Sequence, residues 1–79
     1  MSAAAAAAIE TLLAQRGAGQ TICPSEAARL LAGANSDWRG AMPQVHQAAR
    51  ILAANGEVRL TWRGEPIGEA GGPYRIVRG

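Results

Sequence analysis

The sequence contains no Phe, no Lys and only one Cys. A single Cys excludes an intramolecular disulfide, and no group of Cys and His residues has the spacing of a zinc site. No run approaches the roughly 20 apolar residues that a membrane span needs. No basic residue precedes the alanine run at 3–8, and Glu10 interrupts it, so this run does not resemble a signal peptide. We therefore expect a cytoplasmic protein without a membrane association, a metal or a cofactor.

Large apolar side chains are also scarce. Hydrophobic residues make up 48% of the 79 residues, but 18 of them are Ala, and the only aromatic residues are Trp38, Trp62 and Tyr74. A chain of this length buries only roughly 60% of its unfolded surface, in one small core. These features exclude a large enzyme with a deep substrate cavity, and we expect both Trp side chains in the core.

Charge is modest and unevenly distributed. All eight basic residues are Arg, and six acidic residues leave a net charge of +2. Six of the arginines follow residue 37, where only three Glu oppose them. The planar guanidinium suits phosphates and carboxylates, but this balance is also ordinary for a solvated surface. Charge alone therefore leaves both interpretations open.

Two helices and a short strand are predicted in the first half. Residues 2–16 favour a helix with Ser2 as its cap, an apolar stripe and Gly17 at its end. We expect its alanines to bury little and residues 1–8 to fray.

Thr21-Ile22 fits a brief strand. Cys23-Pro24-Ser25-Glu26 then predicts a helix start in which Glu26 returns a hydrogen bond to the cap. Its apolar stripe is Ala27, Ala28, Leu30 and Leu31, and Gly33, Asn35 and Ser36 close it.

The third helix is predicted over residues 43–54, with Ser36 or Asp37 capping a preceding helical segment that begins at Trp38. Because Pro43 removes an intrahelical hydrogen bond, we expect either a separate short turn or a kink before it. The core face comprises Met42, Val45, Ala48, Ala49, Leu52 and Ala53. The polar arc, His46, Gln47 and Arg50, is the surface that this helix could present to a partner, and Ile51 lies off the main stripe.

After Gly56 the hydrophobic period changes to two. Val58, Leu60 and Trp62 alternate with Arg59, Thr61 and Arg63, which is typical of a half-buried strand. We predict a turn at 64–66, a short return at Ile67 and a glycine-rich loop at 68–72. In the last strand Tyr74 and Ile76 should face inward, and Arg75 and Val77 outward. The chain should thus be one domain over residues 1–79, mainly α with a small β-hairpin: a winged helix-turn-helix, three helices followed by a two- to three-stranded wing.

Three segments resemble a known family. They are Cys23-Pro24-Ser25-Glu26-Ala27-Ala28-Arg29, then Trp38-Arg39 with Met42, Val45, Ala48-Ala49, Leu52 and Gly56, then Gly72-Pro73-Tyr74-Arg75-Ile76. In this order and spacing, from about residue 9 to 78, the chain is similar to the bacterial family called domain of unknown function 3253. The resemblance implies a winged-helix fold, in a stand-alone bacterial protein or module, and no assigned activity. His46 departs from the expected pattern, which more often has Arg there.

The first functional hypothesis is a DNA-binding or regulatory module. Its third helix would enter the major groove with His46, Gln47 and Arg50 at the bases. Phosphates would be held by Arg39, Arg59, Arg63 and Arg75. The structural alternative is a solvated helix face, with Arg39 and Arg75 serving as intramolecular clamps beside buried aromatics.

The second hypothesis is a module that binds protein, either a partner or a second copy as a homodimer, through the first helix, Ile51 or Trp62. An enzyme is not expected. Cys23 and His46 belong to different helices, and no carboxylate is placed to orient the imidazole. Cys23 is better explained as a capping or buried thiol. The stretch at 68–72 lacks the Lys and Ser or Thr of a phosphate loop, so we interpret it as a wing loop.

Overall fold

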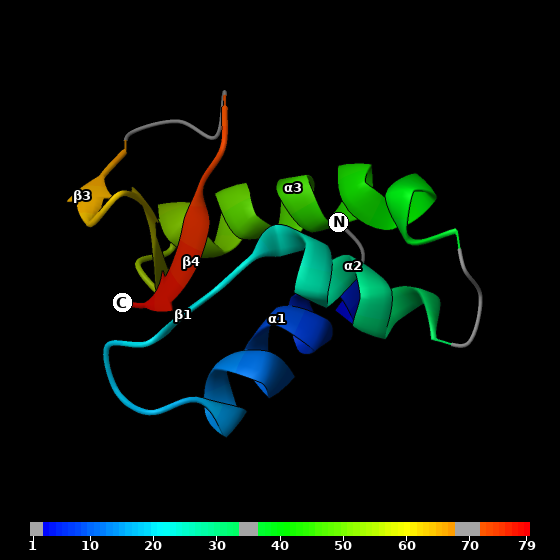
Figure 1. Ribbon diagram of the computed structural model, residues 1–79, viewed down its shortest axis with the longest axis horizontal. Coiled ribbons are helices and arrows are strands. Elements are labelled where there is room, and N and C mark those ends of the chain that lie inside the picture. The colour runs from blue at the N-terminus through cyan, green and yellow to red at the C-terminus, as the bar shows by residue number, and fades with distance from the viewer. Residues whose placement is uncertain (1–2, 34–36, 68–71) are drawn as a thin grey trace.

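The computed structural model describes residues 3–33, 37–67 and 72–79 (Figure 1). The features expected at Ser2, at residues 35–36 and in the loop at 68–71 lie outside these ranges. In chain order the elements are α1 (Ala3–Gln15), β1 (Thr21–Ile22), α2 (Pro24–Ala32), α3 (Trp38–Ala54), β2 (Val58–Trp62), β3 (Glu65–Pro66) and β4 (Arg75–Arg78). The expected arrangement of three helices followed by a small antiparallel wing is confirmed.

The strands form one antiparallel sheet in the order β1-β4-β2-β3. Ile76 of β4 pairs with Ile22 on one side and Leu60 on the other, and all three side chains are buried. Side chains of paired residues lie on the same face of a sheet, so this row forms the face that packs against the helices. The short strand before α2 therefore joins the wing to the helices.

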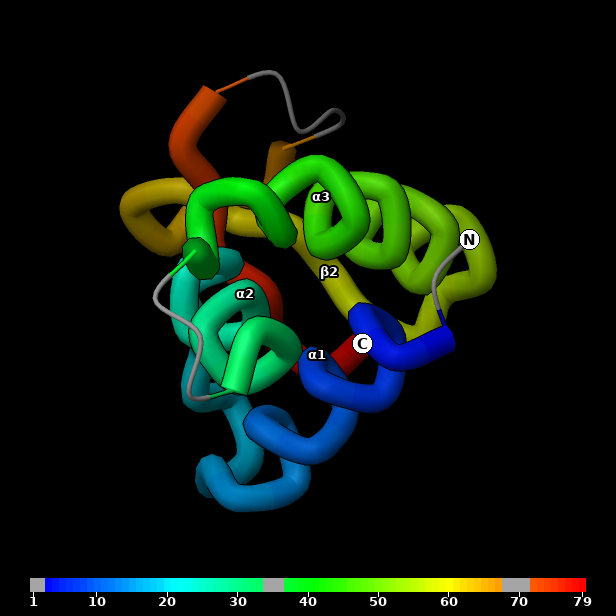
Figure 2. Tube along the Cα trace, turned by 90° about the vertical axis from the view of Figure 1, so that its right-hand side faces the viewer, coloured from blue at the N-terminus to red at the C-terminus, as the bar shows by residue number. Residues whose placement is uncertain are grey.

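Helices α1 and α2 pack on one side of α3, the longest element of the molecule. Figures 1 and 2, which differ by a quarter turn, both show α1 and α2 below α3 and the segment that leads into β4 projecting above it. The largest fully buried side chains, Ile9, Ile22, Val45 and Ile76, come from α1, β1, α3 and β4. One core thus links the helices to the sheet and leaves the upper face of α3 without a covering element among the described residues.

The alanine-rich start of α1 contributes more to the core than expected. Ala5 is fully buried and Ala8 is 6% exposed, alongside Ile9 and Leu13 of the predicted stripe. The expectation that these alanines bury little is wrong, because a side chain of one methyl group lets α1 approach its neighbours closely.

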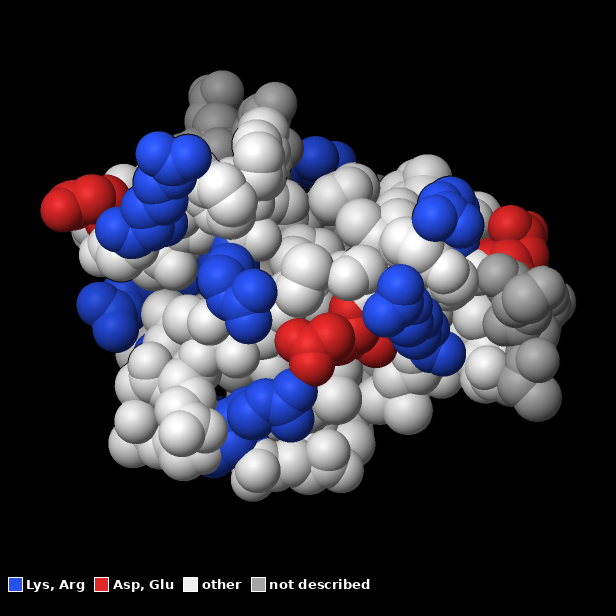
Figure 3. Space-filling view, viewed as in Figure 1, with Lys and Arg blue, Asp and Glu red and all other residues white. Residues whose placement is uncertain are grey.

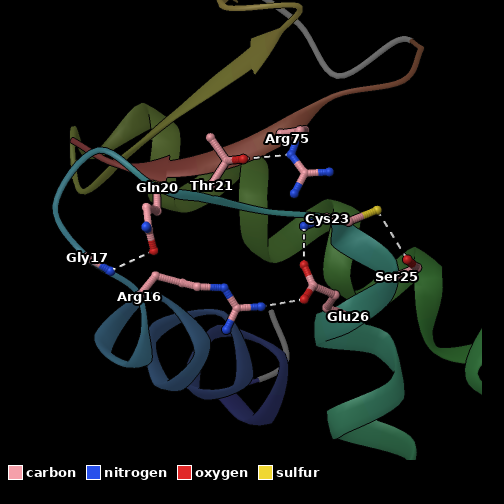
Figure 4. A network of polar contacts seen from close by, with 8 residues as sticks. All are labelled: Arg16, Gly17, Gln20, Thr21, Cys23, Ser25, Glu26 and Arg75. Carbon is pink, nitrogen blue, oxygen red and sulfur yellow. Dashed lines mark hydrogen bonds and ion pairs between the residues drawn. The ribbon is translucent and has the colours of Figure 1, made fainter.

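The start of α2 is built as the sequence predicts. Cys23 is the cap residue, and its backbone N–H donates to Glu26 Oε2 at 2.7 Å. The other carboxylate oxygen accepts from Arg16 at the end of α1, so one side chain both caps α2 and joins it to α1 (Figure 4). At the other end, Gly33 adopts φ 65° and its N–H bonds to the carbonyls of Arg29 and Leu30. Leu30, expected in the apolar stripe, is 47% exposed.

The third helix is longer than predicted. It runs without interruption from Trp38 to Ala54, so the segment before Pro43 belongs to the same helix. Pro43 lies in the second turn, where its missing N–H leaves a single carbonyl, that of Arg39, without its intrahelical donor. The predicted core face is confirmed: Val45, Ala48, Ala49 and Leu52 are buried, and Met42 and Ala53 pack against the core.

The hairpin turn lies one residue earlier than predicted. Trp62 pairs with Glu65, which places Arg63 and Gly64 at the centre of a two-residue turn. Both have positive φ, 54° and 83°, as a type I′ turn requires. The sequence indicated the wrong residues because Glu65-Pro66, chosen for its proline, forms the edge strand β3, where a missing N–H is tolerated.

Two side chains of the wing differ in burial from the expectation. Trp62 is 39% exposed, because it stands at the end of β2 beyond the core, whereas Val58 and Leu60 of the same face are buried. Val77 was expected to face outward, and it is only 4% exposed. It lies at the centre of the sheet between Thr21 and Arg59, whose side chains share its face.

Candidate nucleic-acid interface

The upper face of α3 carries Gln47 and Arg50, and both side chains are exposed. They are presented there because the opposite face of the helix, with Val45, Ala48 and Leu52, is committed to the core. The wing projects on this same side of α3 (Figures 1 and 2). A helix face free of covering elements and a hairpin beside it are the two parts from which a winged-helix contact surface is built.

His46 was predicted on this surface, but it is partly buried and bonded to Tyr74, the residue before β4. Its Nδ1 lies 2.6 Å from the hydroxyl of Tyr74, and the two rings meet at a tilt, with centroids 5.6 Å apart. Burial, and then the charge of Arg50, lower the pKa of His46. The imidazole is therefore held neutral near physiological pH and supplies no positive charge to a ligand.

Arg39 lies at the start of α3 against Trp38. Its guanidinium carbon is 4.3 Å from the centre of the indole ring, and that of Arg29, from α2, is 4.6 Å from the same ring. Both arginines are exposed, whereas Trp38 is only partly buried and packs against the core. The indole thus holds two cations at the junction of α2 and α3. Arg29 was absent from the predicted site, because no local pattern shows that it shares a ring with Arg39.

The hairpin arginines Arg59 and Arg63 are exposed. Arg59 stands on the outer face of the sheet, in the row of Val77. Arg63 occupies the first central position of the turn, and its guanidinium carbon lies 5.8 Å from the ring centre of Trp62. They occupy different parts of the wing, one on the strand and one at the tip.

Arg75 is the predicted residue with the clearest intramolecular role. Its Nε donates to Thr21 Oγ1 at 2.6 Å, and this bond joins β4 to β1 (Figure 4). The side chain is partly buried. The alternative interpretation of Arg75 as an intramolecular clamp is thus supported by a bonded partner, Thr21. This partner is a hydroxyl, however, and not the expected carboxylate or helix end.

The basic side chains do not form one uniform patch on the face shown in Figure 3. Arginines lie both over the sheet and over the helices, and acidic side chains lie between them. Of the acidic groups, Glu26 is engaged by Arg16. Positive charge is therefore not concentrated on this face, and DNA binding there would depend on individual contacts.

Other classes of site find little support in the part of the chain that the structure describes. No group of three or more His, Cys, Asp or Glu residues there could hold a metal ion. Within the same residues, no helix has the length and apolar character to cross a membrane.

A family model matches residues 2–79, nearly the whole sequence. The chain belongs to the DUF3253 family. The description of this family is 'protein of unknown function'. Membership therefore confirms the resemblance found in the sequence and assigns no activity. The match also includes the alanine-rich start, which lies outside the segments that carried the resemblance. A search of curated proteins found no match.

Proposed function

We propose that this DUF3253 protein binds double-stranded DNA. Gln47 and Arg50 would face base edges in the major groove, where Gln pairs with adenine and Arg with guanine. Arg39, Arg59 and Arg63 would hold phosphates on either side. The observation that carries the proposal is the exposed polar face of α3, on the side to which the wing projects.

The assignment of roles follows from exposure and partners. Gln47 and Arg50 lie on the upper face, and α3 buries its other side, so they can enter a groove without unfolding. Arg75 and His46 are bonded to Thr21 and Tyr74, and their contribution would be to position the wing against α3.

The proposal is tested by comparing Arg50→Ala with Arg78→Ala in a duplex-binding titration. Both changes remove one exposed Arg. Arg78, however, is the last residue of β4, at the end of the strand that is away from the segment projecting above α3 (Figure 1). We expect Arg50→Ala to weaken binding about tenfold or more and Arg78→Ala to weaken it less than about threefold. Equal effects of the two variants would show that α3 does not enter the groove.

A second candidate function is self-association or binding of another protein. Its support is the exposure of two large hydrophobic side chains, Leu30 at 47% and Trp62 at 39%. Sedimentation analysis over a range of protein concentrations tests it directly. A dimer that Trp62→Ala or Leu30→Ser dissociates would favour this candidate, and a monomer at all concentrations would remove the homodimer.

A further inference from the structure

A cavity of about 410 Å³ lies between the start of α2, the first half of α3 and the wing. Its volume is within the range of about 300–1,000 Å³ that is usual for small-molecule sites. Most of its wall is apolar, formed by Pro24, Met42, Trp62, Pro73 and Tyr74. The DNA-binding proposal does not use this cavity, because neither Gln47 nor Arg50 lines it.

Trp62 is the unusual part of this wall. It is the largest side chain of the wing, yet it is 39% exposed, and it is absent from the hydrophobic core. An indole that contributes little to the core still exposes an aromatic face beside an apolar hollow. Such a face is well suited to offset stacking with a planar ring.

The polar groups of the wall are few and mainly uncharged. Cys23 Sγ and Ser25 Oγ lie 3.1 Å apart at the start of α2, and both residues line the cavity (Figure 4). His46 lines it as well, with Nδ1 bonded to Tyr74. Of the described charged residues, only Arg75 contributes to the wall, and its Nε is bonded to Thr21. A hydroxyl and an imidazole in an apolar wall favour an uncharged ligand with one or two hydrogen-bonding groups.

We propose that this cavity is a binding site for a small, uncharged, planar aromatic molecule that carries an N–H or O–H group. The ring stacks on Trp62 and contacts Met42 and Pro73, and its polar group bonds to Ser25 Oγ or His46 Nε2. The proposal is independent of DNA binding, since none of these contacts involves Gln47 or Arg50.

The test uses indole as the probe and two measurements. In the first, ¹⁵N-labelled wild-type protein is titrated with indole and followed by two-dimensional NMR. We expect saturable shifts confined to residues that line the cavity. In the second, binding constants of Trp62→Ala and Gln47→Ala are compared with that of the wild type. We expect Trp62→Ala to bind indole about tenfold more weakly, equivalent to ~1.4 kcal/mol, and Gln47→Ala to bind it as the wild type does.

Cyclohexanol serves as the comparison ligand because it is apolar and hydroxylated but not planar. We expect it to bind more weakly than indole. The proposal is overturned if indole gives no saturable shifts, if the shifts fall outside the cavity, or if Trp62→Ala retains wild-type affinity while its NMR spectrum remains that of the folded protein. Equal binding of cyclohexanol and indole would overturn the aromatic specificity. Indole binding that persists when DNA binding is absent would support the site and reject only the proposed function.

Discussion

At the scale of single residues, the pair of His46 and Tyr74 holds α3 to the wing. The two residues are 28 positions apart, and their side chains meet at 2.6 Å where α3 passes the start of β4. Sequence periodicity placed Tyr74 inside, which is confirmed at 4% exposure, and placed His46 on the solvent face. Periodicity describes one element at a time, so it could not show that the sheet covers one edge of this helix face.

The raised pKa of Tyr74 predicts that the protein loses stability at high pH. Burial raises its pKa from 10.0 to about 12, with a smaller raising effect from Cys23 and an opposing one from Arg50. A raised folded-state pKa means that the native protein holds the proton more tightly than the unfolded chain does. The stability contributed by Tyr74 is thus complete below pH 10, and about 2 kcal/mol of it is lost by pH 12.

Urea denaturation between pH 8 and pH 12 measures this loss, and Tyr74→Phe is the matched control because it lacks the titrating hydroxyl. Since Tyr74 is the only tyrosine, its ionisation can also be followed directly by tyrosinate absorbance. A titration midpoint near 10 in the folded protein would contradict the burial of this hydroxyl.

At the scale of elements, the side chain of Glu26 links α1 to α2. Its carboxylate accepts from the backbone of Cys23 and from Arg16, and the two charged side chains are 33% and 31% exposed. This exposure limits the contribution of the ion pair through solvent screening. We expect Glu26→Ala to lower the free energy of unfolding by about 1 to 2 kcal/mol, mostly through the lost cap.

Two variants separate the contributions of Glu26. Glu26→Gln can keep the bond to the cap while removing the ion pair, and it should lose less than Glu26→Ala. Glu10→Ala removes an exposed carboxylate from α1 and should change stability by no more than about 0.5 kcal/mol. Urea denaturation measures all three. A loss for Glu10→Ala equal to that for Glu26→Ala would show that net charge, and not the cap, is responsible.

The turn of the wing is strained at Arg63, a non-glycine residue with φ 54°. Asn tolerates this conformation better, and Asn-Gly is the preferred pair in type I′ turns. We expect Arg63→Asn to raise the free energy of unfolding by about 0.5 kcal/mol. The control is Arg59→Asn, which removes the same charge within a strand and should not stabilise the fold. Thermal denaturation of the pair compares them, and a stabilised Arg59→Asn with an unchanged Arg63→Asn would contradict the turn assignment.

The sequence was most informative where local chemistry determines structure. Glu26 after Cys23-Pro24 indicated the start of α2, and the period of two indicated β2, because both signals depend on residues within a few positions. The exposure of Leu30 and Trp62 could not be predicted in this way, since it depends on which elements lie opposite. The same holds for the candidate site: Gln47 and Arg50 followed from the helical wheel, whereas the sharing of Trp38 by Arg29 and Arg39 required the tertiary structure.

At the scale of the whole molecule, size limits what one copy can contact. Its longest dimension is 32 Å, close to the length of one turn of duplex DNA, about 34 Å. A single copy therefore covers about one turn at most. The described cations assigned to the proposed contact surface are Arg39, Arg50, Arg59 and Arg63, so the number of phosphates engaged should be small.

The central claim is that α3 and the wing bind duplex DNA through these arginines. The most direct test is a fluorescence anisotropy titration of a mixed-sequence duplex with the wild-type protein, at low and at physiological salt. We predict an affinity that falls with salt, with a log–log slope of about −3 to −4, equivalent to about three or four phosphates. An absence of binding at low salt would contradict the claim and show that these arginines serve the fold or a protein partner.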